Sequence, residues 1–320
     1  MSGCVAMESP DRRRGATSLL DMPPVGRLLA LALLLPVVAA CSPAGSAPLG
    51  PPASSSDAAD PCAPWGCAQV SRFDAAAAFV VQQKGHLGIV VKDRVTGAVW
   101  QAGDANLRTW AGSIPKLALA VMLKEEARAG ALTLAPFDEA DIDAMLDTSD
   151  NRAADRLWDK YADSGPMMTR WQTVYGMTAA SYVDGFEQRW GVVKCTPLDL
   201  ANLMSYVLEK VNPADSAYIV ERMRTVGPPQ QWGVWGAGPA LSPGVKNGWD
   251  YIGDASDSTP RWVTSTVGFV GPDERYIVGA MYDQVPGGDT IDAGVHVLTD
   301  LVAIVFGAPV PAPAVVPQDY

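Results

Sequence analysis

Apolar residues recur along the chain at two spacings, which place strands near both ends and helices in the middle. Residues 86–92 alternate weakly and are rich in Gly, Ile and Val, and residues 98–102 follow a turn at 94–97, which predicts a hairpin. Residues 113–129 are apolar on almost every side of the first turns, which is typical of a helix buried in a core. Further helices are expected at 137–146, 151–161, 197–211, 215–225 and 291–306, and further strands at 244–247, 261–270 and 275–282.

This order of elements predicts the fold class. Strands at both ends and helices between them indicate an α/β sandwich, in which the sheet is completed by distant parts of the chain. We expect one such domain at residues 70–306. No internal repeat occurs, and no Gly-rich phosphate loop lies between a strand and a helix, so we expect no cofactor.

The amino-terminal part of the chain has the pattern of an export signal. Residues 28–40 form an uncharged apolar run that is too short to span a bilayer, with Arg27 before it and Cys41 after it. The ending Val38-Ala39-Ala40-Cys41 resembles a bacterial lipobox, which implies cleavage after residue 40 and diacylation of the Cys41 thiol. The alternative is a buried strand or helix that happens to end in Cys.

The segments that flank the domain have low-complexity compositions. Residues 42–64 are rich in Pro, Ala, Ser and Gly, and such a composition cannot bury enough apolar surface to fold. We therefore expect a signal peptide at 1–40, a lipidated Cys with a tether at 41–69, and a flexible tail at 307–320. The mature protein would be anchored by lipid to the outer face of the cell membrane.

Charge and histidine content exclude several functions. The chain of 320 residues has 24 Lys and Arg against 35 Asp and Glu, a formal charge of -11 that repels nucleic acid phosphates. Only two histidines occur, His86 in an expected strand and His296 in an expected helix, and there is no G-x-S-x-G elbow for a Ser-His-Asp triad. We expect neither nucleic acid as a partner nor a metal site.

Three of the five cysteines fall in the expected mature domain and its tether. Cys62 and Cys67 most simply pair across a small loop in an oxidising exterior, which would leave Cys195 free and buried. The alternatives, in which Cys195 bridges to either of the others, stay open because connectivity is not readable from sequence.

Two short motifs lie at the starts of expected helices. Ser113 and Lys116 are three positions apart, so they share a helix face, and a Lys buried among apolar residues can serve as the base that a Ser nucleophile needs. Ser149-Asp150-Asn151 offers a hydroxyl that can relay a proton and an amide that can orient a carbonyl. The alternative for the second motif is an ordinary helix cap.

A third motif, Lys246-Asn247-Gly248, ends an expected strand. A Lys at this place could bind a substrate carboxylate, and Gly lets the backbone approach a ligand closely. On its own this tripeptide is also a common turn.

In this order the motifs resemble those of class A β-lactamases and penicillin-binding proteins, whose signatures are S-x-x-K, S-D-N and K-T-G. The chain is also similar to exported lipoproteins of mycobacteria that carry compact domains of this type. The resemblance implies an antiparallel sheet flanked by helices, with a mainly helical subdomain. It implies the following roles: Ser113 as nucleophile, Lys116 as base, Ser149 as proton relay, Asn151 and Lys246 as substrate contacts, and the N–H groups of Ser113 and Trp249 as oxyanion hole.

The sequence departs from the family at two places. Asn247 replaces the usual Ser or Thr, and bulky Trp249 follows Gly248, which would change or narrow the pocket that these residues form for the substrate carboxylate. No E-x-x-L-N element occurs between Gly176 and Thr196, where the only Glu is Glu187, so the base for deacylation is unassigned. Glu187 or Asp184 could activate the deacylating water, and the alternative for each is a solvated loop carboxylate. Four tryptophans are expected near the cleft or in the core: Trp232, Trp235, Trp249 and Trp262.

Two functions of different class follow. The first is an exported serine hydrolase that forms a Ser113 acyl-enzyme with an amide, lactam or ester, such as a small molecule or peptidoglycan-like substrate of the cell envelope. The second is a lipoprotein with weak or no turnover that binds peptidoglycan or a protein partner. Fold resemblance alone does not decide between them.

Overall fold

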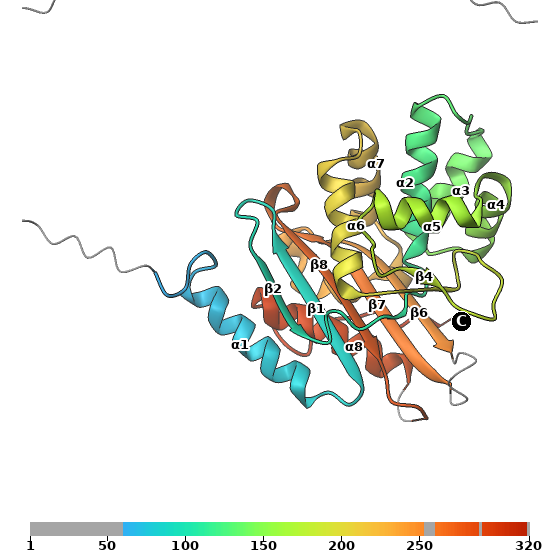
Figure 1. Ribbon diagram of the computed structural model, residues 1–320. Coiled ribbons are helices and arrows are strands. Elements are labelled where there is room, and N and C mark those ends of the chain that lie inside the picture. Colours follow the sequence, from blue (N-terminus) through green and yellow to red (C-terminus); the bar gives the residue numbers. More distant parts are fainter. Residues whose placement is uncertain (1–59, 253–259, 288–289, 319–320) are drawn as a thin grey trace, which may run out of the picture. The chain divides into compact units, whose positions relative to one another are not determined.

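The computed structural model describes residues 60–252, 260–287 and 290–318 (Figure 1). The expected signal peptide, Cys41 and most of the tether lie outside the described residues. Among the helices of the described part, none is both long and apolar enough to cross a membrane.

A five-stranded antiparallel sheet forms the centre of the domain, with the order β2-β1-β8-β7-β6. Val90 of β1 pairs with Gly279 of β8, so strands from the two ends of the domain lie side by side, as the sequence predicted (Figure 1). The strands are β1 (His86–Asp93), β2 (Val99–Gly103), β6 (Gly244–Ile252), β7 (Arg261–Val270) and β8 (Tyr276–Asp283).

Helices cover both faces of this sheet. Helices α1 (Cys67–Gln82) and α8 (Ile291–Phe306) pack together on one face, where Ile89 and Val91 of β1 contribute to the core. Val90 points to the opposite face, where α6 (Pro197–Glu209) crosses the sheet. Because helices cover both faces, the inner strands are buried at nearly every position rather than at alternate ones.

The helical subdomain lies between β3 and β6 in the sequence, in green and yellow in Figure 1. Its central helix α2 is buried on all sides of its first turns, because its early residues from Leu117 to Leu123 are almost all apolar. The further helices are α3 (Pro136–Asp147), α4 (Asn151–Tyr161), α5 (Ser164–Thr173) and α7 (Pro213–Arg224), with α2 at Pro115–Arg128. A small sheet, which the sequence pattern did not predict, has the order β3 (Thr109–Trp110), β5 (Val193–Cys195), β4 (Ser181–Tyr182).

The amino-terminal edge of the domain differs from the expected boundary. Helix α1 begins at Cys67, three residues before the expected start of the domain, and buries Phe73, Ala76 and Val80 on one face. Four consecutive alanines occupy positions 75–78, so its helical periodicity is weak in the sequence. A disulfide joins Cys62 to Cys67, with their Cα atoms 4.9 Å apart, and Cys195 is a buried free thiol.

The carboxy-terminal segment was expected to be a flexible tail, but its described residues pack on the domain. The N–H of Ala312 donates to Asp300 Oδ1 (2.7 Å), and the N–H of Val315 donates to the carbonyl of Gln231 (3.1 Å). Ala312 is buried. Apolar side chains in this segment gain contact with the α1–α8 layer, and its prolines reduce the entropy lost on ordering.

Candidate active site

The first two motifs meet at the start of α2. Ser113 lies two residues before the first residue of this helix, and Lys116 Nζ donates to Ser113 Oγ at 3.0 Å. The same ammonium nitrogen donates to the carbonyl of Ser149 (2.5 Å) and to Asn151 Oδ1 (2.6 Å). Lys116 is fully buried, so these oxygens satisfy its donors in place of water.

The surroundings of Lys116 favour its neutral form. Burial lowers the pKa of Lys116 to about 7, although the negative charges of Asp150 and Asp155 act in the opposite direction. The indole ring of Trp190 lies 4.4 Å from Lys116 Nζ, which adds a cation–π contact when the amine is protonated. An amine with this pKa can exchange a proton at neutral pH.

Ser149 lies between two lysines. Its Oγ is 3.2 Å from Lys116 Nζ and 2.8 Å from Lys246 Nζ. Its backbone has φ +65°, a left-handed conformation that costs free energy for a residue other than Gly. This turn brings both the carbonyl and the hydroxyl of Ser149 to Lys116, and it is a point of local strain at the place where the two motifs converge.

Lys246 lies next to Ser149 and is fully buried. Besides Ser149, its Nζ contacts Gln230 Oε1 (3.2 Å) and the carbonyl of Asn247 (2.7 Å). Burial, and secondarily the charge of Lys116, lower the pKa of Lys246 well below its usual range. Gln230, which no sequence motif marked, also accepts a hydrogen bond from the N–H of Asn247 (2.8 Å).

The third motif lies within β6, which continues to Ile252 rather than ending at Asn247. Side chains alternate between the faces of a strand, so Lys246 and Gly248 face the helical subdomain while Asn247 faces the α8 side. Asn247 Nδ2 donates to the carbonyls of Gln230 (2.9 Å) and Trp232 (3.2 Å). The expected substrate contact of Asn247 is therefore replaced by contacts to buried backbone.

Gly248 allows two backbone segments to touch. A Cβ at Gly248 would lie 2.6 Å from the nitrogen of Ser113, and one at Gly112 would lie 2.6 Å from the nitrogen of Trp249. The N–H groups of Asn247 and Tyr251 bond away from β7, and strand alternation places the N–H of Trp249 at the same open edge. This geometry brings the two nitrogens expected for an oxyanion hole to one place.

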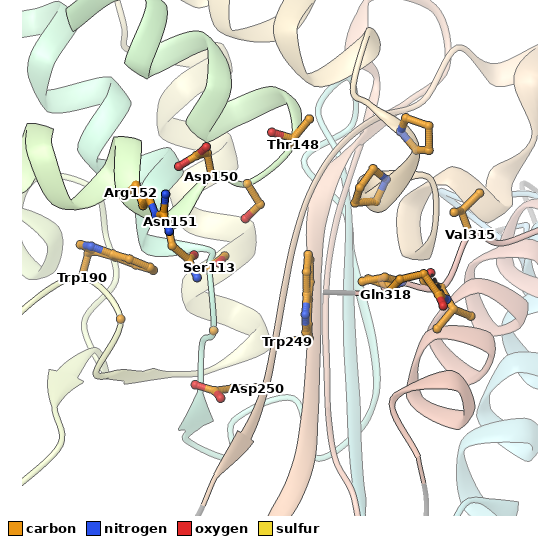
Figure 2. Close-up of a pocket in the computed structure, with 17 residues that line it drawn as sticks. Ser113, Thr148, Asp150, Asn151, Arg152, Trp190, Trp249, Asp250, Val315 and Gln318 are labelled. Atoms are coloured by element: carbon orange, nitrogen blue, oxygen red, sulfur yellow. Dashed lines mark hydrogen bonds between the residues drawn. The ribbon is translucent and has the colours of Figure 1, made fainter. Parts of the chain in front are cut away.

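A pocket of about 860 Å³ opens over Ser113. Figure 2 shows Ser113, Asn151 and Trp190 on one side, with Trp249 and the carboxy-terminal Gln318 on the other. Lys116 and Lys246 are absent from the lining, so the pocket presents hydroxyls, amides, carboxylates and the guanidinium group of Arg152 to a ligand. The complete lining is Gly112, Ser113, Thr148, Ser149, Asp150, Asn151, Arg152, Trp190, Gly191, Pro228, Pro229, Trp249, Asp250, Val315, Val316, Pro317 and Gln318.

Glu187 does not line this pocket. Its side chain is 83% exposed and lies 3.9 Å from Arg189 Nη1, whereas Trp190 is buried beside Lys116. The Nε1 of Trp190 donates to Asp155 Oδ1 (3.0 Å), which fixes the indole. The loop thus brings an aromatic ring to the pocket, and it directs its Glu to solvent.

The other expected aromatics and histidines lie mostly elsewhere. The four tryptophans considered all pack in or against the core on the α8 side, and Trp249 also lines the pocket. The histidines are outside the pocket: His86 pairs with Asp104 and His296 with Asp292. Among the described residues, one group could hold a metal, namely Asp60 with Cys62 and Cys67, and its sulfurs are joined in the disulfide.

Comparison with solved structures identifies the fold. A beta lactamase from Burkholderia vietnamiensis aligns with a TM-score of 0.59 and 21% identity, covering 76% of this chain and 96% of its own. A structure named PBP-A aligns with a TM-score of 0.61 and 17% identity, over 74% and 95% of the two chains. The chain has the class A β-lactamase fold. The α/β sandwich predicted from the sequence is thereby confirmed.

Sequence comparison finds relatives that are named as lipoproteins rather than as β-lactamases. A protein of Mycobacterium tuberculosis, named LppW and described by that name as a candidate lipoprotein, is 30% identical over 203 residues. The same name and identity apply to a protein of Mycobacterium bovis. The match covers 60% of this chain and 61% of the length of these curated relatives. No family model matches the chain.

Proposed function

We propose that the protein is a serine hydrolase that forms an acyl-enzyme at Ser113. The observation that carries this proposal is the buried Lys116, whose Nζ lies 3.0 Å from Ser113 Oγ and whose pKa is lowered to about 7 by burial. A serine hydroxyl is a weak nucleophile at neutral pH unless a neighbouring base accepts its proton. Several proteins that share the fold are named β-lactamases, which is consistent with this chemistry.

Acylation would proceed by transfer of one proton along the motifs. Neutral Lys116 takes the proton of Ser113 Oγ as this oxygen bonds to the carbonyl carbon of an amide, lactam or ester. The N–H groups of Ser113 and Trp249 stabilise the resulting oxyanion. Lys116 then gives the proton to Ser149 Oγ, and the Ser149 hydroxyl proton passes to the leaving nitrogen or oxygen as the scissile bond breaks.

The other residues of the motifs support this path. Lys246 Nζ, 2.8 Å from Ser149 Oγ, would stabilise negative charge on that oxygen during the transfer. The amide nitrogen of Asn151 would bind the carbonyl of the substrate beside its scissile bond, since Asn151 Oδ1 accepts from Lys116. Because Lys116 acts as the neutral base, the acylation rate should rise with pH up to about 7 and then level off.

The test is intact-mass spectrometry of the full chain in detergent, mixed with a fluorescent penicillin and separately with a fluorophosphonate. We expect one adduct per chain with at least one probe, and none in Ser113→Ala. Ser205→Ala, which changes a serine outside the pocket, should keep the adduct. No adduct with either probe would contradict the proposal.

A second function, weak or absent turnover with binding of peptidoglycan or a protein partner, is favoured by one observation. The Asn247 side chain is directed away from the pocket and both lysines are missing from its lining, which weakens recognition of a substrate carboxylate by the third motif and leaves Arg152 as the cationic side chain of the lining. Calorimetry of Ser113→Ala with soluble peptidoglycan fragments tests this alternative. Binding without any acylation of the wild-type chain would establish it.

We also propose export and lipid anchoring through Cys41. The name of the mycobacterial relative and the lipobox-like sequence support this location. In an actinobacterial host, Cys41→Ala should move the protein from the membrane pellet to the soluble or unprocessed fraction. Equal membrane recovery of both forms, without a lipid mass on the wild type, would contradict it.

A further inference from the structure

Hydrolysis of an acyl-enzyme requires a group that activates water, and the sequence does not assign one. Glu187, the candidate offered by the loop 176–196, is directed into solvent. The carboxylates that line the pocket are instead those of Asp150 and Asp250. They reach it from different elements, Asp150 from the start of α4 and Asp250 from β6.

The β6 strand directs Asp250 toward the nucleophile. Residues Lys246, Gly248 and Asp250 share one face of the strand, and Gly248 touches the backbone of Ser113 on that face. Asp250 is two residues further along, a backbone distance of about 7 Å. Figure 2 shows its carboxylate on the side of the pocket where the Ser113 loop and Trp190 lie.

The pocket that Asp250 shares with Ser113 is lined in part by glycines. Gly112 and Gly191 line the pocket together with Asp250 and contribute no side-chain atoms. No non-neighbouring atom lies within 4 Å of a Cβ built on Gly191, so the surroundings of that glycine are open. Ser113 and Asp250 line this same pocket of about 860 Å³, so a water molecule in the pocket can approach both residues.

The two pocket carboxylates differ in their burial and in their hydrogen bonds. Asp150 is exposed, and its Oδ1 caps α4 by accepting from the N–H of Ala153 (2.8 Å). Asp250 is half-buried, and its Oδ1 accepts from the N–H of Tyr251 (2.8 Å), which fixes the carboxylate plane. In the described part of the chain no contact to Asp250 Oδ2 occurs. Burial raises the pKa of Asp250, which makes it a better base than an exposed carboxylate.

We propose that Asp250 is the general base that activates water for hydrolysis of the Ser113 acyl-enzyme, an inference that rests on the proposed function. Asp250 Oδ2 takes a proton from water as the water oxygen bonds to the ester carbonyl carbon. The tetrahedral intermediate then collapses, and the bond from carbon to Ser113 Oγ breaks. The proton on Asp250 returns to Ser113 Oγ, so that the acid is released and both side chains regain their starting states.

The experiment follows the lifetime of the adduct on the full chain in detergent, with a fluorescent penicillin and with p-nitrophenyl acetate as probes. Asp250→Asn keeps the hydrogen bond from Tyr251 and removes the base. We expect deacylation to slow by about 100-fold or more, because general bases contribute 10²- to 10⁴-fold, while the acylation rate changes by less than about 3-fold. Asp250→Glu should restore part of the rate.

Two further readouts separate this role from a structural one. Deacylation by the wild type should slow as the pH falls through the raised pKa of Asp250, and this dependence should vanish in Asp250→Asn. Glu187→Gln, the matched control for an exposed carboxylate, should deacylate at the wild-type rate. Melting temperatures of all variants show whether each is folded.

The possible failures are distinguishable. If the adducts of Asp250→Asn and of the wild type have the same lifetime, Asp250 is not the base. If Glu187→Gln alone traps the adduct, the exposed loop carboxylate is the base instead. If no chain with Ser113 intact forms an adduct with either probe or with a fluorophosphonate, the proposed function itself fails.

Discussion

At the scale of single residues, the burial of Lys116 lowers the pKa of its amine and also lowers the stability of the fold. Its amine is fully buried beside Trp190, in surroundings that disfavour a charge. Removal from water lowers its pKa from the ordinary value of 10.5 to about 7. The same desolvation that makes Lys116 a base therefore costs folding free energy whenever the amine is protonated.

The pH dependence of the free energy of unfolding tests whether burial of protonated Lys116 costs stability. Between pH 7 and pH 10.5 the unfolded chain holds a proton on Lys116 that the folded chain lacks, so the free energy of unfolding rises with pH in this window. Below pH 7 both states are protonated and this contribution is constant. For one proton the slope is at most about 1.4 kcal/mol per pH unit.

We expect the wild type to gain about 2–3 kcal/mol more than Lys116→Met between pH 7 and pH 9, measured by urea unfolding with tryptophan fluorescence. Lys124→Met, which removes a lysine paired with Glu139 outside the pocket, should keep the wild-type dependence because Lys116 is intact. Parallel curves for the wild type and Lys116→Met would show that the buried amine does not carry this linkage.

At the scale of elements, the close approach of β6 to the loop before α2 determines the geometry around Ser113. A Cβ at Gly248 would meet the carbonyl oxygen of Ala111 at 2.4 Å and the nitrogen of Ser113 at 2.6 Å. Both are backbone atoms, so they cannot move aside as a flexible side chain can. Separation of the loop from β6 would pull apart the N–H groups of Ser113 and Trp249.

Gly248→Ala should therefore lower the rate of acylation by about 10-fold or more and destabilise the fold by about 1–3 kcal/mol. Gly165→Ala is the matched control, because no non-neighbouring atom lies within 4 Å of a Cβ at that position and its φ is not left-handed. Adduct formation by mass spectrometry and urea unfolding measure both effects. Equal rates in the two variants would mean that the close approach is not required.

The carboxy-terminal segment is a second element that shapes the pocket. Val315 to Gln318 form part of its lining, and Figure 2 shows Gln318 beside Trp249. A chain ending at Ala308 should lose about 1–3 kcal/mol of stability, because it loses the buried Ala312 and the hydrogen bond from Val315 to Gln231. It should also react relatively faster with a bulky fluorescent penicillin than with p-nitrophenyl acetate. An unchanged ratio of the two rates would show that the segment does not limit access.

The sequence predicted those elements whose pattern is local. The apolar first turns of α2, the hairpin at β1 and β2, and the strands β7 and β8 follow from spacing and turn residues alone. Helix α1 was missed because a run of four alanines interrupts its apolar periodicity and only Phe73, Ala76 and Val80 mark its buried face. The segment after Phe306 looked flexible from its prolines, since its contacts come from residues distant in the chain.

The same distinction applies to the site. Ser113 and Lys116 are one helical turn apart, so their contact was predictable from local geometry. Trp190 and Asp250 reach the pocket, and Gln230 reaches Lys246, through the tertiary fold, and no spacing in the sequence relates these three residues to Ser113. The orientation of Asn247 depended on where β6 ends, because an alternating strand assigns each residue to one face.

At the scale of the whole molecule, the sheet connects the two ends of the domain. Strand β1 pairs with β8, and the helical subdomain with the first two motifs lies between β3 and β6 in the sequence. These two motifs meet the third motif on β6, so the candidate site is complete only when the sheet and the helical subdomain have docked. We therefore expect the site and the sheet to unfold as one cooperative unit.

Ile89→Ala tests this coupling from a residue outside the pocket. Ile89 is fully buried in the core between the sheet and the α1–α8 layer, and its truncation should cost about 2–5 kcal/mol. The acylation rate of the folded variant should stay within about 2-fold of the wild type, because no pocket residue changes. In urea, tryptophan fluorescence and the ability to form the adduct should be lost in one transition, shifted to lower urea by the same amount. Loss of the adduct before the fluorescence change would show that the helical subdomain opens independently of the sheet.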